Sequence, residues 1–361
     1  MTQSFLDRRA ALRLGFGAAG ATLLSSLGGA AWADVISSAK IDSSSEMAKG
    51  VQKSGKLRIG FSNGFSGNTW RTECLNSMQA EAKPNSDKYE LIIADGQGDI
   101  SKQVNDIEDL ISQQVDAILC IANSGTAVVP ALRKATRAGI LTIPFNLPVE
   151  GENWTAFVGT DPKRKGATSG KALSTSLGGK GNIIALGGLP GNSYTADCWA
   201  GAQTQFGPGI EVLAFKDASW QEDKAKIVTA DLIAAYPQID GIWCDGGQDT
   251  AGALKALIAA GRPLVPATGD DYNGLLKLYD AEKAKNPNFK ISILSEPTWE
   301  GVVALRTAVR LLSGQDAPRR QIIDPFLIDG SNYESFIKRD LPDGVYVDTV
   351  LSDEDLRKLF G

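Results

Sequence analysis

Short apolar runs rich in Ile, Val and Leu alternate along the chain with amphipathic segments of helix length. In the first half the runs are LRIGFSN, YELIIAD, DAILCIAN and ILTIPFN, and in the second half they are NIIALGG, IEVLAFKD, DGIWCDGG and LVPATGDD. Between them lie SKQVNDIEDLISQQ, TAVVPALRKATRAG, KAKIVTADLIAAYP and TAGALKALIAAG, each ending near Gly or Pro as helices tend to. This alternation predicts an α/β protein with doubly wound parallel sheets.

The two halves repeat each other at an offset of 124 positions. The octet GNTWRTEC (67 to 74) matches GNSYTADC (191 to 198), and identities at the same offset run from Ile59 with Ile183 to Cys120 with Cys244. We therefore expect two lobes built as copies of one half. Each octet falls in the turn after a first strand, and in such sheets binding sites lie beyond the carboxyl ends of the strands.

Composition narrows the function classes. A chain of 361 residues is long enough for two lobes, and its net charge of −5 argues against nucleic acid, which favours a basic surface. The chain has no histidine, which excludes histidine metal ligands and Ser-His-Asp or Cys-His catalysis. It also lacks G-x-S-x-G, Walker and CxxC motifs, so we expect no catalytic residues, no cofactor and no metal site.

The N-terminus has the layout of an export signal. Arg8, Arg9 and Arg13 precede a Gly/Ala/Leu-rich segment that ends in Ala31-Trp32-Ala33, an A-x-A cleavage site. The paired arginines are typical of the twin-arginine class. A membrane anchor is the alternative, but Gly and Ala dilute the apolar run. We expect residues 1–33 to be a cleaved signal, residues 34–55 to form a flexible lead-in, and the protein to be periplasmic.

The four cysteines follow the duplication. Cys74 and Cys120 are 46 positions apart, as are Cys198 and Cys244. Exported proteins meet an oxidising compartment, and only these two pairings keep each disulfide within one lobe. We predict disulfides Cys74–Cys120 and Cys198–Cys244; four buried free thiols are the alternative.

Several ordered motifs resemble the periplasmic sugar-binding proteins of the ribose and galactose type. They are DGQGDISKQVNDIEDLISQQVDAIL (95 to 119), IPFN (143 to 146), FVGTD (157 to 161), DASWQEDKA (217 to 225), ATGDD (267 to 271) and SEPTWEG (295 to 301). The resemblance implies the periplasmic binding protein type I fold, two doubly wound lobes joined by a three-segment hinge. The N-lobe would hold residues 56–160 plus 297–325, and the C-lobe residues 161–296 plus 326–361. The crossings would fall near 159–161, 295–297 and 324–326.

The resemblance also implies a ligand site in the cleft between the lobes. A sugar presents apolar C–H faces, which suit flat aromatic rings, and a rim of hydroxyls, which suit planar polar groups. Trp70 and Trp220 match the family's two facing aromatic positions. The expected ligand-binding residues are Asn68, Trp70, Arg71, Asn146, Asn192, Tyr194, Trp220, Asp245, Gln248, Asp270, Ser295 and Glu296.

Some of these residues have simpler structural interpretations. Either Trp70 or Trp220 could merely pack a turn, and Asp270 or Asn192 could serve as a helix N-cap. The family often has Asp followed by Arg where this chain has Asn146 followed by Leu147, and Arg71 could replace that arginine.

The function that the resemblance implies is that of a solute-binding subunit, which delivers a monosaccharide or polyol to the permease of an ABC importer. We expect a monomer, with a chemoreceptor or sensor kinase as an alternative partner. A sugar acid bound by Arg71 is an alternative ligand. An exported enzyme using Asp270 and Asp271 is a third possibility, although adjacent strand residues point to opposite faces.

Overall fold

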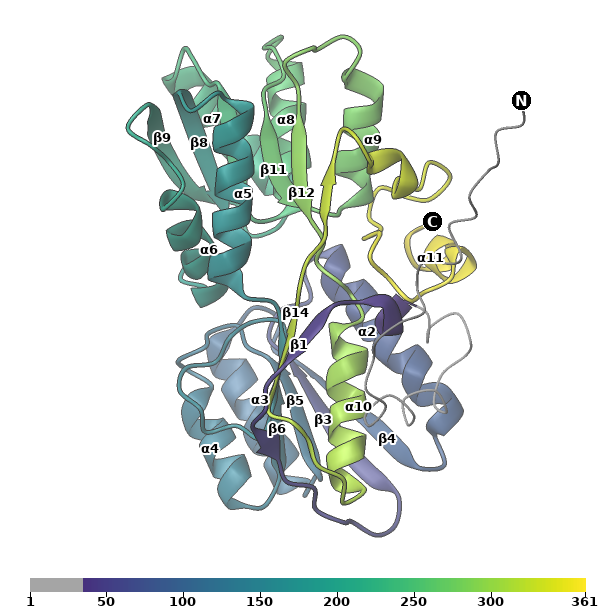
Figure 1. Cartoon of the computed structure of the whole chain (residues 1–361). Helices are drawn as coiled ribbons and strands as arrows, with labels where there is room; N and C mark the ends of the chain where they lie inside the picture. The colour runs from purple at the N-terminus through teal and green to yellow at the C-terminus, as the bar shows by residue number, and fades with distance from the viewer. Residues whose placement is uncertain (1–34) are drawn as a thin grey trace, which may run out of the picture.

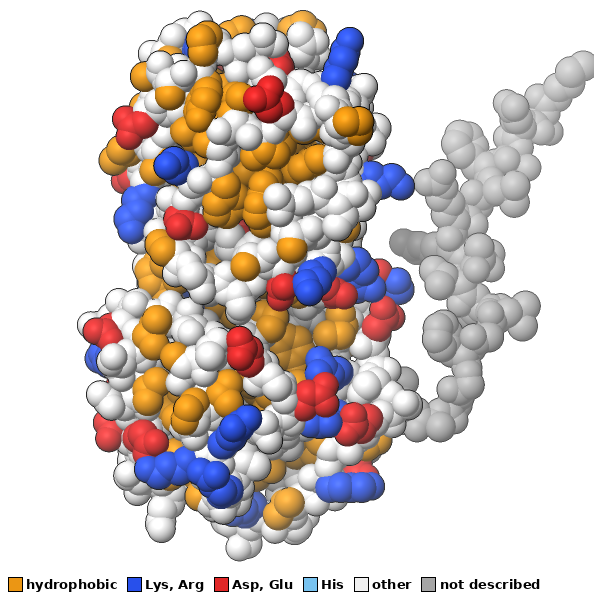
Figure 2. Space-filling model, turned by 90° about the vertical axis from the view of Figure 1, so that its left-hand side faces the viewer, with side chains coloured by type: hydrophobic (Ala, Val, Ile, Leu, Met, Phe, Trp, Pro, Cys, Tyr) orange, Lys and Arg blue, Asp and Glu red, His pale blue; other side chains and the backbone are white. Residues whose placement is uncertain are grey.

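The computed structural model describes residues 35–361, so the expected export signal in residues 1–33 lies outside the described residues. Figure 1 shows two α/β lobes stacked one above the other and joined by several strands of chain. Figure 2 shows one face of the molecule, on which acidic and basic side chains are interspersed over both lobes. Within residues 35–361, no helix is long and apolar enough to span a membrane.

The N-lobe is built on a parallel four-stranded sheet of order β4-β3-β5-β6. Each strand corresponds to one of the apolar runs of the first half. Helix α2 lies on one face of the sheet with α10 (Glu300–Leu312), and α3 and α4 lie on the other. The elements are β3 (Leu57–Asn63), α2 (Thr69–Ala82), the 3-10 turn η1 (Lys83–Asn85), β4 (Tyr89–Asp95), α3 (Ile100–Ser112), β5 (Ala117–Ile121), α4 (Val129–Arg137) and β6 (Leu141–Pro144).

The C-lobe repeats this plan in a six-stranded sheet of order β15-β12-β11-β10-β8-β9, in which only the edge strand β15 is antiparallel to its neighbour. The expected doubly wound α/β architecture is therefore confirmed. Its elements are α5 (Pro162–Ser176), β8 (Gly181–Gly187), α6 (Ser193–Gln203), β9 (Ile210–Asp217), α7 (Glu222–Ala235), β10 (Gly241–Cys244), α8 (Gly247–Ala259), β11 (Ala267–Asp270), α9 (Asn273–Glu282), β12 (Ile291–Leu294) and β15 (Leu327–Asp329).

The chain crosses between the lobes three times. It leaves the N-lobe between β7 (Phe157–Gly159) and α5, returns between β12 and α10 (Glu300–Leu312), and leaves again between β14 (Arg320–Ile323) and β15. Strand β7 continues the N-lobe sheet through a bridge between Phe145 and Val158 and pairs with β14. These are the crossings of the expected three-segment hinge.

Both ends of the described chain differ from the expectation. In place of a flexible lead-in, β1 (Ile41–Ser43) pairs with β14 beside the hinge, and β2 (Met47–Ala48) pairs with β13 (Ala317–Pro318). The C-terminal segment contains a 3-10 turn, η2 (Tyr333–Ser335), and helix α11 (Asp353–Phe360). Leu356 of α11 packs in a cluster with Ala80 of α2, so the chain end reaches the N-lobe instead of staying in the C-lobe.

The predicted disulfides are wrong for this structure, because all four cysteines are buried free thiols. Alternation along β5 places Cys120 in the core cluster beneath α3 and α4, whereas Cys74 of α2 packs on the opposite face of the sheet. In the C-lobe, Trp243 faces α5 and α6, with its indole donating to Ser169 Oγ at 3.0 Å. The next residue, Cys244, therefore faces away from Cys198 of α6.

Candidate functional site

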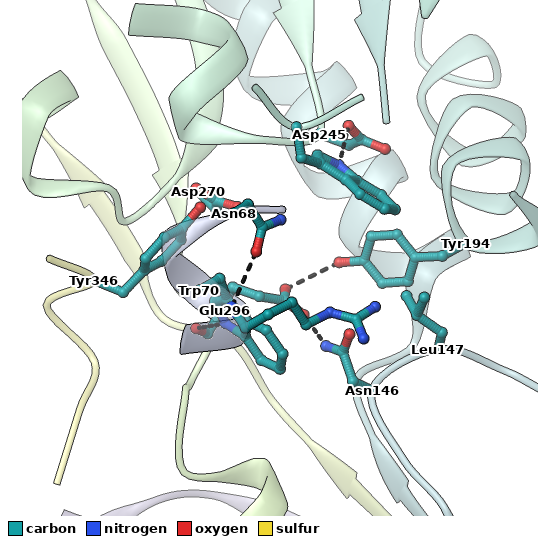
Figure 3. Close-up of a pocket in the computed structure, with 11 residues that line it drawn as sticks. Asn68, Trp70, Asn146, Leu147, Tyr194, Asp245, Asp270, Glu296 and Tyr346 are labelled. Carbon is teal, nitrogen blue, oxygen red and sulfur yellow. Dashed lines mark hydrogen bonds between the residues drawn. The ribbon is translucent and has the colours of Figure 1, made fainter. Parts of the chain in front are cut away.

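A pocket lies between the lobes, where the carboxyl ends of the strands of both sheets meet. The space in it that atoms do not occupy is about 380 Å³, including solvent at its open side. Figure 3 shows its lining side chains converging from several separate elements. They are Asn68, Trp70, Arg71, Asn146, Leu147, Tyr194, Trp220, Asp245, Asp270, Glu296 and Tyr346.

The first octet places three pocket residues, Asn68, Trp70 and Arg71, at the start of α2. Asn68 is the N-cap, and its Oδ1 accepts from the backbone N–H of Arg71 at 3.0 Å. Arg71 also donates from its guanidinium to Asn63 Oδ1 at 2.7 Å. Burial lowers the pKa of Arg71 to about 10, so it stays charged at neutral pH. Trp70 Nε1 donates to the backbone oxygen of Glu296 at 2.8 Å, which fixes its indole across the hinge.

Trp220 enters the pocket from the C-lobe with an unusual backbone. Its φ is 52°, a left-handed conformation that is rare for a bulky residue and costs about 1–3 kcal/mol. The ring lies against Gly188 and Gly246, where a β-carbon would be 2.0 Å and 2.6 Å from indole atoms. Its Nε1 donates to Asp245 Oδ1 at 3.2 Å. The surrounding structure thus maintains this conformation in order to present the ring to the cleft.

Two carboxylates of the C-lobe line the same side of the pocket. Asp245 is fully engaged, since its second oxygen accepts from Thr195 Oγ1 at 2.7 Å. Asp270 accepts from the backbone N–H of Gly247 at 2.6 Å, and its second oxygen has no hydrogen bond among the described residues. Burial raises the pKa of Asp245 to about 6 and that of Asp270 to about 7. Asp270 therefore has an oxygen available for a ligand.

A buried ionic cluster closes the hinge side of the pocket. Lys165 of α5 forms a salt bridge with Glu296 Oε2 and donates to the Tyr194 hydroxyl at 3.0 Å. Tyr194 donates to Glu296 Oε2 at 2.9 Å, and Asn146 Nδ2 donates to Glu296 Oε1 at 2.7 Å. Burial disfavours the charge of Lys165, but the carboxylates of Glu296 and Asp270 outweigh it and raise its pKa. The cluster ties the N-lobe residue Asn146 to the C-lobe.

Three of the expected site residues do not line this pocket. Asn192 is the N-cap of α6, the alternative that the sequence left open, and its Nδ2 donates to the backbone oxygen of Asn123 at 3.4 Å. Gln248 Nε2 donates across the cleft to Thr69 Oγ1 at 2.5 Å. Ser295 lies at the hinge, where its Oγ accepts from the backbone N–H of Phe326 at 3.3 Å.

Sequence reasoning missed two important residues. Lys165 supports Glu296, and its position four residues after the first crossing, at the start of α5, was an available signal. Tyr346 lines the pocket from the C-terminal segment, and nothing in the local sequence marks it.

The acidic residues do not form a catalytic pair. Asp270 lines the pocket, whereas Asp271 accepts from the backbone N–H of Glu296 and of Asp348, both at 2.7 Å, and so holds the hinge.

Within the described residues, one group brings potential metal ligands within 4.8 Å of one another: Cys244, Asp245 and Asp249. Asp245 and Asp249 already accept the indole and backbone N–H groups of Trp220, so their structural role is to position that ring.

The chain is similar in sequence to one known protein family and to several named proteins. The profile of the family described as "Periplasmic binding protein domain" matches residues 59–316. The xylitol-binding protein of Mycolicibacterium smegmatis is 32% identical over 248 residues, which cover 68% of this chain and 69% of that protein. The ribose import binding protein RbsB of Bacillus subtilis is 25% identical over 260 residues, which cover 72% of this chain and 83% of that protein.

Solved structures have the same fold. An ABC transporter solute-binding protein from Mycobacterium smegmatis with bound glycerol superposes with a TM-score of 0.71 at 27% identity, covering 79% of this chain and 98% of its own. A solute-binding protein from Bacillus halodurans with bound myo-inositol gives a TM-score of 0.72 at 24% identity, covering 79% and 99%. The likeness in fold extends over both lobes.

Proposed function

The chain belongs to the periplasmic binding protein domain family, and from this premise we propose that it captures a neutral monosaccharide or polyol as the solute-binding subunit of an ABC importer. The observation that carries the proposal is a small pocket between two lobes, lined by Trp70 and Trp220 and rimmed by planar polar groups. Members of this family bind solutes and are not enzymes. Because one relative is named for xylitol and another for ribose, the proposed ligand class includes both polyols and monosaccharides.

The free hydrogen-bonding capacity of the pocket suits hydroxyl groups. Asn68 has an unused amide N–H₂, Arg71 has further guanidinium N–H groups, and Asp270 has an unused carboxylate oxygen. These groups supply donors and acceptors, and each hydroxyl of a polyol can serve as both. The indoles of Trp70 and Trp220 would pack on the C–H faces of the ligand.

The balance of charge favours a neutral ligand over a sugar acid. Three acidic side chains, Asp245, Asp270 and Glu296, line the pocket, and the neighbouring Lys165 is already paired with Glu296. A ligand carboxylate bound to Arg71 would lie near these acidic groups, which disfavours it. A sugar acid remains the alternative ligand because Arg71 is buried, charged and part of the pocket.

Closure of the hinge would be the conformational change that the membrane subunits of the importer recognise. Direct hydrogen bonds bridge the mouth of the cleft: Gln248 Nε2 to Thr69 Oγ1 at 2.5 Å and Gln221 Nε2 to the Gly67 backbone oxygen at 3.3 Å. A ligand that contacts both lobes would stabilise this closed arrangement because it cannot make both sets of contacts in an open one. Gln248 would thus contribute to closure instead of ligand contact, as would Asn192.

Localisation and partners follow from the same premise. The family is periplasmic, and we propose that residues 1–33 are a twin-arginine export signal cleaved after Ala33. The mature protein would act as a monomer and deliver its ligand to the membrane subunits of the importer. A chemoreceptor or sensor kinase is a second candidate partner, since it could read the same closure.

A thermal-shift screen of the purified protein tests the proposal. The panel should contain pentoses, hexoses, polyols, sugar acids and amino acids, with the protein first unfolded and refolded to remove any ligand that co-purifies. A ligand at 100 times its dissociation constant adds about 2.7 kcal/mol to the stability of the folded state. Shifts with neutral sugars or polyols, absent in Trp220→Ala, would support the proposal. Shifts confined to sugar acids or amino acids would contradict it, and turnover of the ligand would indicate an enzyme.

A further inference from the structure

The C-terminal segment contributes one wall of the pocket. We call residues 341–349 the C-terminal strap. They lie beyond residue 316, where the match to the family profile ends. In Figure 1 the yellow segment between β15 and α11 descends from the C-lobe toward α2 of the N-lobe, beside the hinge.

The strap is fixed to the C-lobe at the turn between β11 and α9. The backbone N–H of Asn273 donates to the Val345 oxygen at 2.7 Å, and that of Val347 donates to the Asp271 oxygen at 3.2 Å. The backbone N–H of Asp348 donates to Asp271 Oδ2 at 2.7 Å. These bonds flank Tyr346 on both sides, so the backbone that carries it is held against the carboxyl end of β11.

The strap is also fixed to the N-lobe and to the second crossing. The backbone N–H of Tyr346 donates to Glu73 Oε2 of α2 at 3.0 Å. Trp299, at the start of α10, donates from Nε1 to Asp348 Oδ1 at 2.8 Å. The two sets of contacts hold the strap between the lobes, at the place where the ligand pocket lies.

The side chain of Tyr346 points into the pocket with an unused hydroxyl. The residue is 2% exposed, and its ring packs on that of Tyr272 with centroids 5.9 Å apart. Its hydroxyl has no hydrogen bond to any of the described residues, and Figure 3 shows it directed toward Asp270. Asp270 also has an unused carboxylate oxygen. A donor on Tyr346 and an acceptor on Asp270 are therefore both available to a ligand at the surface of the same pocket.

We propose that Tyr346 is a ligand-binding and specificity-determining residue supplied by the C-terminal strap. Its hydroxyl donates to a ligand hydroxyl that in turn donates to Asp270. Its ring limits the length of the ligand on this side, so the pocket selects a small polyol or sugar over a larger one. This inference rests on the proposed function, because it assigns a further contact within the same pocket.

Calorimetric titration with xylitol, D-ribose and myo-inositol tests the inference on the full protein. Tyr346→Phe keeps the ring and removes the hydroxyl, so affinity for the best probe should fall by about 2- to 12-fold. Tyr346→Ala removes the ring as well and should improve myo-inositol relative to the smaller probes. Tyr333→Phe is the control. That tyrosine is also 2% exposed and lies outside the pocket, with its hydroxyl 2.6 Å from Asp280 Oδ1, so its loss should leave affinity unchanged.

The outcomes separate the inference from the proposed function. If the wild-type protein binds a probe and Tyr346→Phe binds it equally well, the inference is overturned while the proposed function stands. If the wild-type protein binds neither the three probes nor any sugar or polyol of the wider screen, both the inference and the proposed function are overturned. An affinity loss in Tyr333→Phe as large as that in Tyr346→Phe would show a general effect of losing a buried hydroxyl, which would also overturn the inference.

Discussion

Gly188→Ala is expected to displace Trp220 without touching any polar group of the site. A β-carbon at residue 188 would lie 2.0 Å from Cε2 and 2.2 Å from Cζ2 of the Trp220 indole. Carbon atoms in contact rest about 3.5 Å apart or more, so the ring would have to move by about 1.5 Å. It is also confined by Gly246, whose β-carbon position lies 2.6 Å from Cδ1 of the same ring. The movement would break the bond from Nε1 to Asp245.

The size of the effect can be estimated from what the ring contributes. Truncating a central aromatic residue of a binding site costs about 1–3 kcal/mol, so the dissociation constant should rise by about 5- to 150-fold. Overpacking should also lower the free energy of unfolding by about 1–3 kcal/mol. Calorimetric titration with the best sugar or polyol measures the first quantity, and urea unfolding without ligand measures the second.

Gly207→Ala provides the matched control. No heavy atom lies within 4 Å of a β-carbon at residue 207, so this change should leave both quantities unaltered. If Gly188→Ala binds ligand within about twofold of the wild-type protein while Gly207→Ala behaves as expected, Trp220 does not form a wall of the ligand site.

Four further outcomes are expected. Trp70→Ala and Trp220→Ala should each weaken binding by about 1–3 kcal/mol in calorimetric titration while keeping a cooperative thermal transition, and unchanged affinity in both would exclude the aromatic pair. Lys165→Met leaves the Glu296 carboxylate buried without its ammonium partner, so it should lower the free energy of unfolding in urea by about 3–5 kcal/mol. If the same change at an exposed lysine lowered the free energy of unfolding by more, the burial of the pair would be contradicted. Burial raises the pKa of Asp270 from 3.8 to about 7, so the folded protein binds more protons than the unfolded chain between these pH values. The free energy of unfolding of the ligand-free protein should therefore fall as the pH rises from about 4 to about 7, and Asp270→Asn should make this fall shallower. An equally steep fall in the variant would argue against this assignment. Unfolding without reductant in the presence of iodoacetamide should add four adducts per chain, as expected for four free thiols, and two or none would indicate disulfides.

Part of the site that sequence analysis predicted lies within the repeat, whereas Asn146, Asp270 and Glu296 came from the motifs IPFN, ATGDD and SEPTWEG. The octets place a polar cap and an aromatic residue directly after the first strand of each half, and the parallel sheet brings these turns to one edge. Asn68, Trp70 and Tyr194 were found in this way. The motif DASWQEDKA led to Trp220, although its left-handed backbone depends on contacts with Gly188 and Gly246 that no local pattern reveals.

The parts that were missed depend on contacts between distant segments. Lys165 and Glu296 are 131 positions apart and meet only because two crossings run side by side. Tyr346 reaches the pocket only because the chain end returns across the hinge. The cysteine pairing failed for a different reason: equal spacing in sequence ignored the two-residue period of β5, which turns Cys120 away from α2.

A crystal structure of the protein with the neutral sugar or polyol that gives the largest thermal shift would test the proposed ligand site most directly. We predict one ligand molecule between the lobes, with its C–H faces packed on Trp70 and Trp220 and a hydroxyl within hydrogen-bonding distance of the free oxygen of Asp270. A ligand bound outside the cleft, or one in the cleft that touches neither indole, would contradict it.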